Sequence, residues 1–220
     1  MKTERIKRYA LLLIGLLIAG TGVGFTKVAA LGVSPISSVP NVMSLRFPVM
    51  TIGNYLIIWN CLLIAAQAAI LRKNFKPFQL FQIVISILFG YFTDFGVFIA
   101  GKIPADIYPA RLAMSVCGVI LLGFGITLTV IADIILNAGE AFVKVLSDTL
   151  GKDFSSVKVV FDVSNVLLAL ILSLVFFGGK IVGMREGTVI AAVGTGFVVK
   201  FFTKLLKGRL NAFLSGKSEK

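Results

Sequence analysis

The stretch LGVSPISSVP, Leu31–Pro40, interrupts an otherwise apolar chain with two prolines and three serines. Serine followed by proline is typical of a helix start, because serine suits the N-cap and proline suits the first helical position. We therefore predict a short helix over 35–46 that begins after Ser34. At about three turns, this helix is too short to cross a membrane.

A second polar interruption, LNAGEAFVKV at Leu136–Val145, follows about a hundred residues later. Asn137 can cap a helix there, and a carboxylate at Glu140 favours the positive end of that helix. A matching short helix is predicted over 138–150, ending at Gly151. Each short helix either lies on the membrane surface or enters the protein as a re-entrant half-helix, since non-helical backbone at membrane depth needs protein or water around it.

The rest of the chain is dominated by long apolar runs. Of its 220 residues, 57% are hydrophobic and 15% are charged, with a mean hydropathy of +0.97, whereas soluble domains carry about 25% charged residues. A hydrocarbon layer of about 30 Å needs about 20 residues of helix. The fold class expected is an all-α polytopic membrane protein, one domain over 1–220 in the lipid bilayer, with six transmembrane helices at 9–26, 50–71, 78–100, 112–135, 157–178 and 187–206.

The order of small residues predicts an internal repeat. Gly15, Gly20 and Gly22 match Gly118, Gly123 and Gly125 at a constant offset of 103, while Asn60 matches Asn165 and Gly90 matches Gly196 at slightly larger offsets. The predicted halves are 9–100 and 112–206, followed by a basic tail at 207–220. Each half has three spans, so the second enters the membrane from the opposite side, as in the inverted-topology repeats of secondary transporters. A signal peptide would share the basic start, but the matching segment at 112–135 favours a retained first span.

The basic residues lie at the ends of the apolar runs. The net charge is +12, yet a nucleic-acid-binding protein gathers its basic residues on one exposed face, so we expect no nucleic acid partner. With the N-terminus in the cytoplasm, 16 of the 22 basic residues fall inside, as the positive-inside rule requires. Both termini are therefore predicted to be cytoplasmic, with 101–111 and 179–186 outside.

Nothing in the chain argues for an enzyme. It has no histidine, and Cys61 and Cys117 lie in apolar runs without a metal-ligand pattern, so they are expected to be packing residues. The usual nucleophile, zinc and phosphate-loop motifs do not occur. We expect no catalytic residues, no metal and no cofactor.

Three stretches resemble the YczE/YitT-like integral membrane proteins of bacteria: GVSP after the first run, GEAFVKVLSDTLGKDFSSVKVVFDVSNVLLALILSL, and GMREGTVIAAVGTGFVVKFF. The resemblance implies a six-span protein of the bacterial plasma membrane whose molecular activity is largely unassigned. Where the motif usually has tryptophan, this chain has Ile36. The positions that match are Gly32, Ser34, Pro35, Gly139, Glu140, Lys158, Asp162, Gly187, Thr188 and Gly196.

Polar residues at membrane depth are the candidates for function, because a charge at the bilayer centre costs about 2.5–3.5 kcal/mol on insertion scales. Purely structural roles also remain open for several of these residues. Lys158 can form an i,i+4 pair with Asp162, and the Lys200 side chain can extend to the lipid headgroups. The amides, including Gln67 and Gln82, can form hydrogen bonds between helices. The substrate-binding or ion-coupling candidates are Ser34, Asn60, Asp94, Glu140, Asp162, Asn165 and Lys200.

Asp94 is the sharpest of these candidates, because its neighbours are aromatic and apolar. Lys27, Arg46 and Arg111 are predicted on the same outer side of the membrane, so one of them can pair with it, as can a coupling ion. The leading hypothesis is a small secondary transporter or facilitator of a small polar or anionic solute, with its site between the halves. Alternatives are a membrane substrate-binding subunit with an energising partner, or a non-transporting accessory or scaffold protein; a homodimer is left open.

Overall fold

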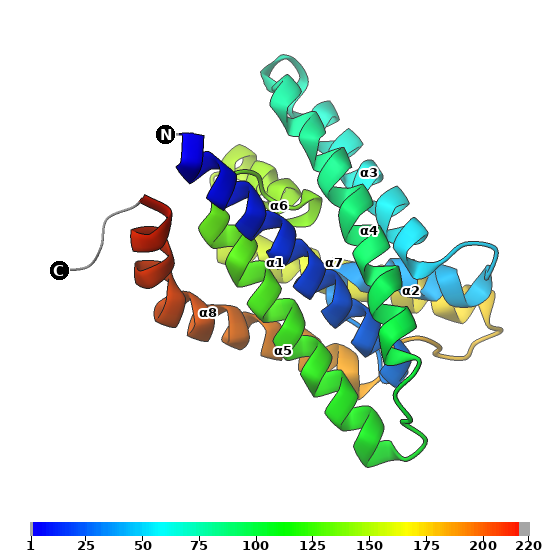
Figure 1. The fold of residues 1–220 in the computed structure, drawn as a ribbon. Helices are drawn as coiled ribbons and strands as arrows, with labels where there is room; N and C mark the ends of the chain where they lie inside the picture. Colours follow the sequence, from blue (N-terminus) through cyan, green and yellow to red (C-terminus); the bar gives the residue numbers. More distant parts are fainter. Residues whose placement is uncertain (1, 216–220) are drawn as a thin grey trace.

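The computed structural model describes residues 2–215, and within this part every regular element is helical (Figure 1). Six helices in this part are long and apolar enough to cross a membrane, as the hydropathy predicted. They are α1 (Lys2–Ala29), α3 (Ile52–Leu71), α4 (Phe81–Ala100), α5 (Tyr108–Ala132), α7 (Phe154–Phe176) and α8 (Glu186–Ser215); the short helices are α2 (Pro35–Arg46) and α6 (Ala138–Leu150), and the turns η1 (Arg72–Asn74) and η2 (Pro77–Leu80) join α3 to α4.

The two short helices have the bounds that the sequence predicted. Their N-caps have nearly the same backbone, with φ −58° and ψ 152° at Ser34 and φ −59° and ψ 151° at Asn137. The caps differ in chemistry. The Asn137 side chain accepts a hydrogen bond from the Ala138 N–H at 2.8 Å, whereas the Ser34 hydroxyl donates to the Ser37 hydroxyl at 3.0 Å. Gly151 ends α6 in the left-handed region, at φ +60°.

Helix α1 lies at the centre, between α4 and the antiparallel α5 (Figure 1). The α1–α5 contact depends on glycines, because their missing side chains let the two backbones approach. A Cβ on Gly22 would lie 2.6 Å from the carbonyl oxygen of Gly118, and one on Gly125 would lie 2.5 Å from that of Gly15. Cys61 on α3 and Cys117 on α5 are both free, as expected.

Helices α2 and α6 are not laid on the outside of the bundle. Helix α2 packs against α3 and α7 and buries 35 and 37–42 almost completely. Helix α6 buries its apolar face, from Ala138 to Ser147, against α3 and α7, while Lys144 and Asp148 form an exposed pair on its outer face. Helix α2 is therefore largely enclosed by protein, while the depth of both short helices in a membrane stays a prediction.

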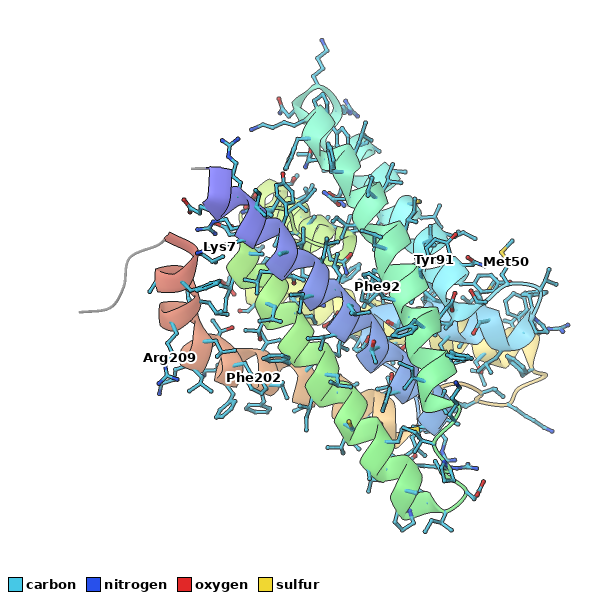
Figure 2. All side chains as sticks on the ribbon, in the orientation of Figure 1. Lys7, Met50, Tyr91, Phe92, Phe202 and Arg209 are labelled. Atoms are coloured by element: carbon cyan, nitrogen blue, oxygen red, sulfur yellow. The ribbon has the colours of Figure 1, made fainter. Side chains whose placement is uncertain are left out.

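Helix α8 is the most outward-facing of the spans. Its side chains Val189, Val193, Phe197 and Phe201 are all more than half exposed, as suits contact with lipid. Its last turns cover much of the segment that was expected to be a basic tail. There Leu214 is buried, and Lys7 of α1 donates to the carbonyl of Phe213 at 2.8 Å; Figure 2 shows Lys7 beside the end of α8.

Candidate functional site

The first turns of α2 and α6 meet in the interior of the protein. Ile36 and Gly139 are in such close contact that a Cβ on Gly139 would collide with Cδ1 of Ile36. Pro40 lies inside α2 and has no N–H, so position 40 donates no hydrogen bond to the carbonyl of Ile36. We call this contact the α2–α6 junction; it brings Ser34 and Glu140 into one neighbourhood, because each lies within two residues of it.

Helices α3 and α7 form the walls beside the junction. Trp59 and Leu63 of α3 pack with Ile36, Val143 and Phe161 in one apolar cluster. A polar atom buried in such a cluster is expensive to leave without a partner, at about 1–3 kcal/mol. A buried polar side chain of α3 or α7 that has no hydrogen-bond partner therefore needs an explanation.

Two such side chains are Asn60 of α3 and Asn165 of α7, which are 2% and 3% exposed. Asn165 Nδ2 donates to the carbonyl of Phe161 at 2.8 Å, but within residues 2–215 its Oδ1 has no partner. Neither Asn60 Nδ2 nor the indole N–H of Trp59 has a partner there. The two asparagines thus offer hydrogen-bonding capacity beside the junction.

Glu140 adds a carboxyl group to this region. Burial raises the pKa of Glu140 above its ordinary value; nearby Lys158 opposes that shift and Asp162 adds to it. Lys158 Nζ lies 2.5 Å from Asp162 Oδ1, as the i,i+4 spacing predicted. Two acids and one base therefore lie close together near the starts of α6 and α7.

Asp94 lies elsewhere, at the start of α3. Its Oδ2 accepts from the Thr51 hydroxyl at 2.6 Å and its Oδ1 accepts from the Gly53 N–H at 3.0 Å. A carboxylate at a helix N-terminus is favourable in itself, so no cation is needed. Of the partners that the sequence left open, the three basic residues form no ion pair with Asp94 in the described chain: Lys27 binds Asn41 and Ser44, Arg46 lies over the Phe47 ring, and Arg111 donates to the Ala105 carbonyl. A coupling ion at Asp94 stays a prediction.

Lys200 is also separate from the junction. It is exposed on α8, and it forms no ion pair with any residue that the structure describes. This position favours the snorkelling alternative. Of the seven candidates, Ser34, Asn60, Glu140, Asp162 and Asn165 gather around the α2–α6 junction, whereas Asp94 and Lys200 do not.

Two buried amides, Gln67 and Gln82, form the bonds between helices that the sequence had left open for them. Gln67 Nε2 donates to Gln82 Oε1 at 3.1 Å and to the Ala138 carbonyl at 3.2 Å, so these amides fasten the start of α6 to α3 and α4. Thr188 is 5% exposed and its hydroxyl has no partner within the described chain. It packs against Gly32, whose φ of +110° and lack of a side chain make room for it. Both residues are among the positions that match the YczE/YitT-like stretches, but no local pattern in the sequence indicated that they touch.

This arrangement defines a multi-pass α-helical membrane protein in which two short helices touch inside the protein, with buried polar side chains on the neighbouring helices. The chain belongs to the family described as "Family of unknown function (DUF6198)", whose model matches residues 6–204. No curated protein and no solved structure matches the chain. The resemblance to YczE/YitT-like proteins stays a prediction.

Proposed function

We propose that α1–α4 and α5–α8 form an inverted-topology repeat, and that the protein is a small transporter or facilitator of a polar or anionic solute in the bacterial plasma membrane. The repeat is supported by reciprocal contacts. Gly22 touches Gly118 and Gly125 touches Gly15, and both pairs exchange roles at the same offset of 103. Reciprocal contacts between equivalent residues are the mark of a two-fold relation.

Other features obey the same offset. Ala30 and Asp133 both leave their helices in the left-handed region, at φ 56° and 51°. Helix α2 packs on α7 as α6 packs on α3. Ile36 and Gly139 are equivalent residues that touch each other, which is expected only on the two-fold axis itself. Because α1 and α5 are antiparallel and related by this axis, the axis lies across the helices, in the plane of a membrane that they span.

The α2–α6 junction is the observation that carries the function. In inverted repeats, sites lie near the midplane where broken helices from the two halves meet, and helix N-termini favour anionic groups. Asn60 and Asn165 supply hydrogen bonds on either side of the junction. In the conformation observed here Ile36 fills the junction, so the solute would bind after the two halves move apart.

Uptake into liposomes tests this proposal. Purified protein should move solute alone, using a panel of amino acids, nucleosides, vitamins and inorganic anions. Asn60→Ala and Asn165→Ala should each lower uptake at least tenfold, whereas Ser164→Ala, which changes the exposed neighbour of Asn165, should not. Binding without movement would indicate a substrate-binding subunit, and neither binding nor movement would indicate a scaffold; both outcomes contradict the proposal.

The orientation is a separate proposal that rests on the 16 inside basic residues. A single cysteine at Ala105, after replacement of Cys61 and Cys117, should react with a membrane-impermeant reagent in intact cells. Protection of that cysteine until the cells are opened would reverse the orientation.

A further inference from the structure

Lys27, near the end of α1, is held by neutral groups. Its Nζ donates to Asn41 Oδ1 at 2.7 Å and to the Ser44 hydroxyl at 2.9 Å, both on α2. Asn41 in turn donates from Nδ2 to the carbonyl of Gly183 at 2.7 Å, which ties the segment between α7 and α8 to the same point. Among the residues that the structure describes, no carboxylate forms an ion pair with Lys27.

A stripe of polar side chains on α2 ends at the Lys27 ammonium of α1. The stripe consists of side chains at helical spacing, each with a hydroxyl or amide, and its first four members are buried: Ser34, Ser37, Ser38, Asn41 and Ser44. Seven residues separate Ser34 from Asn41, which is about 10 Å along a helix. The stripe therefore runs from the start of α2 to an ammonium group about 10 Å along the helix.

A half-buried ammonium needs compensation for the water that it has lost. The ammonium group has three donors, and the two used here meet neutral acceptors. Asn41 and Ser44 lie in the last turns of α2, where the helix dipole supplies the equivalent of about half a negative charge. That half charge offsets part of the free-energy cost of removing water from the Lys27 ammonium, but not all of it.

We propose that Lys27, together with Asn41 and Ser44, binds an anionic oxygen group, a carboxylate or a phosphate, belonging either to a free solute or to a lipid headgroup. The third donor of the ammonium meets the anion, and the α2 hydroxyls extend from it toward the start of α2. The inference deepens the proposed function and rests on it only in taking the anion to be the transported solute, since binding does not require transport.

Thermal unfolding in lipid nanodiscs tests the site. In nanodiscs of phosphatidylcholine, sodium acetate or sodium phosphate, titrated against sodium chloride at constant ionic strength, should raise the melting temperature of the wild type saturably. A rise produced only by including phosphatidylglycerol would assign the anion to a lipid headgroup. Lys27→Gln should abolish the response, whereas Lys102→Gln, which removes an exposed lysine lying over the Phe98 ring, should keep it.

Ser44→Asp places a carboxylate beside the ammonium and decides the matter if Lys27→Gln fails to fold. This variant should melt above the wild type without added anion and should not respond to any. The proposal is overturned if the wild type responds to neither source, if Lys27→Gln still responds, or if Ser44→Asp responds like the wild type. Anion binding without uptake in liposomes would leave this site standing and would remove only the transport proposal.

Discussion

Helices α2 and α6 begin with the same backbone and differ in their charges. Their N-caps agree within a degree in φ and ψ, and their lengths are 12 and 13 residues. Apart from Arg46 at its end, the polar groups of α2 are neutral, and the ammonium of Lys27 donates to two of them. Around α6 the charges are Glu140, the exposed Lys144–Asp148 pair and the Lys158–Asp162 pair. The difference teaches that two helices can start with the same backbone while the side chains around them carry different charges.

The largest effect is expected where the two short helices touch. Gly139→Ala should lower stability by about 3 kcal/mol, because overpacking a filled site costs about 1–3 kcal/mol and the new Cβ meets Cδ1 of Ile36. Ile36→Val removes that methyl group, so the double variant should recover much of the loss. Gly196→Ala is the matched control, since a Cβ there has no neighbour within 4 Å.

Thermal unfolding of the four variants in detergent measures this coupling. If Gly139→Ala melts like the wild type, or if Ile36→Val does not relieve it, the junction is looser than the structure has it. The Ile36–Gly139 contact could then no longer support the comparison of the two short helices.

A second comparison concerns how α3 and α7 begin. Helix α3 has its own N-cap, Thr51, and is also contacted at its start by Asp94 of α4. Among the described residues, helix α7 has only its N-cap Asp153 there, which accepts from the Ser155 and Ser156 N–H groups. Asp94→Asn keeps one acceptor and loses the charge, so it should lower stability by about 1–2 kcal/mol, given about 1.5–3 kcal/mol for hydrogen bonds to charged groups. Asp153→Asn, at an exposed cap, should have a smaller effect.

The melting temperature and ion-dependent uptake of Asp94→Asn separate structure from coupling. Loss of stability with residual ion-dependent uptake supports the capping role. Normal stability with loss of ion dependence would instead make Asp94 a coupling residue, as its sequence context first suggested.

Local signals explain which parts of the fold could be predicted. Ser34–Pro35 and Gly151 mark helix ends within a few residues, so the bounds 35–46 and 138–150 were predictable, and hydropathy located the long spans. Helix α8 runs on to Ser215 because its end packs on α1, a long-range contact that basic residues in 207–215 concealed. The site was predictable only as a set of polar residues. The contacts of Asp94 with Thr51 and of Lys27 with Asn41 depend on tertiary packing, which no local pattern contains.

The smallest effect is expected from the charge of Glu140. Burial raises the pKa of this carboxyl in the folded protein, so the folded state prefers the protonated form. The stability that the protonated Glu140 carboxyl contributes is then fully present below the unfolded pKa, about 4.3. This contribution is lost as pH rises through the folded pKa. Glu140→Gln should match the wild type at low pH and exceed it at neutral pH, by about 1.4 kcal/mol for each pKa unit of the shift.

Melting temperatures of the wild type and Glu140→Gln across this pH range measure that divergence. Asp148→Asn, on the exposed face of the same helix, is the control and should run parallel to the wild type. The two other charges that act on Glu140 are those of Lys158 and Asp162, so Asp162→Asn should shift the divergence to lower pH by removing one cause of the raised pKa. Parallel curves for the wild type and Glu140→Gln would mean that α6 tolerates the charge.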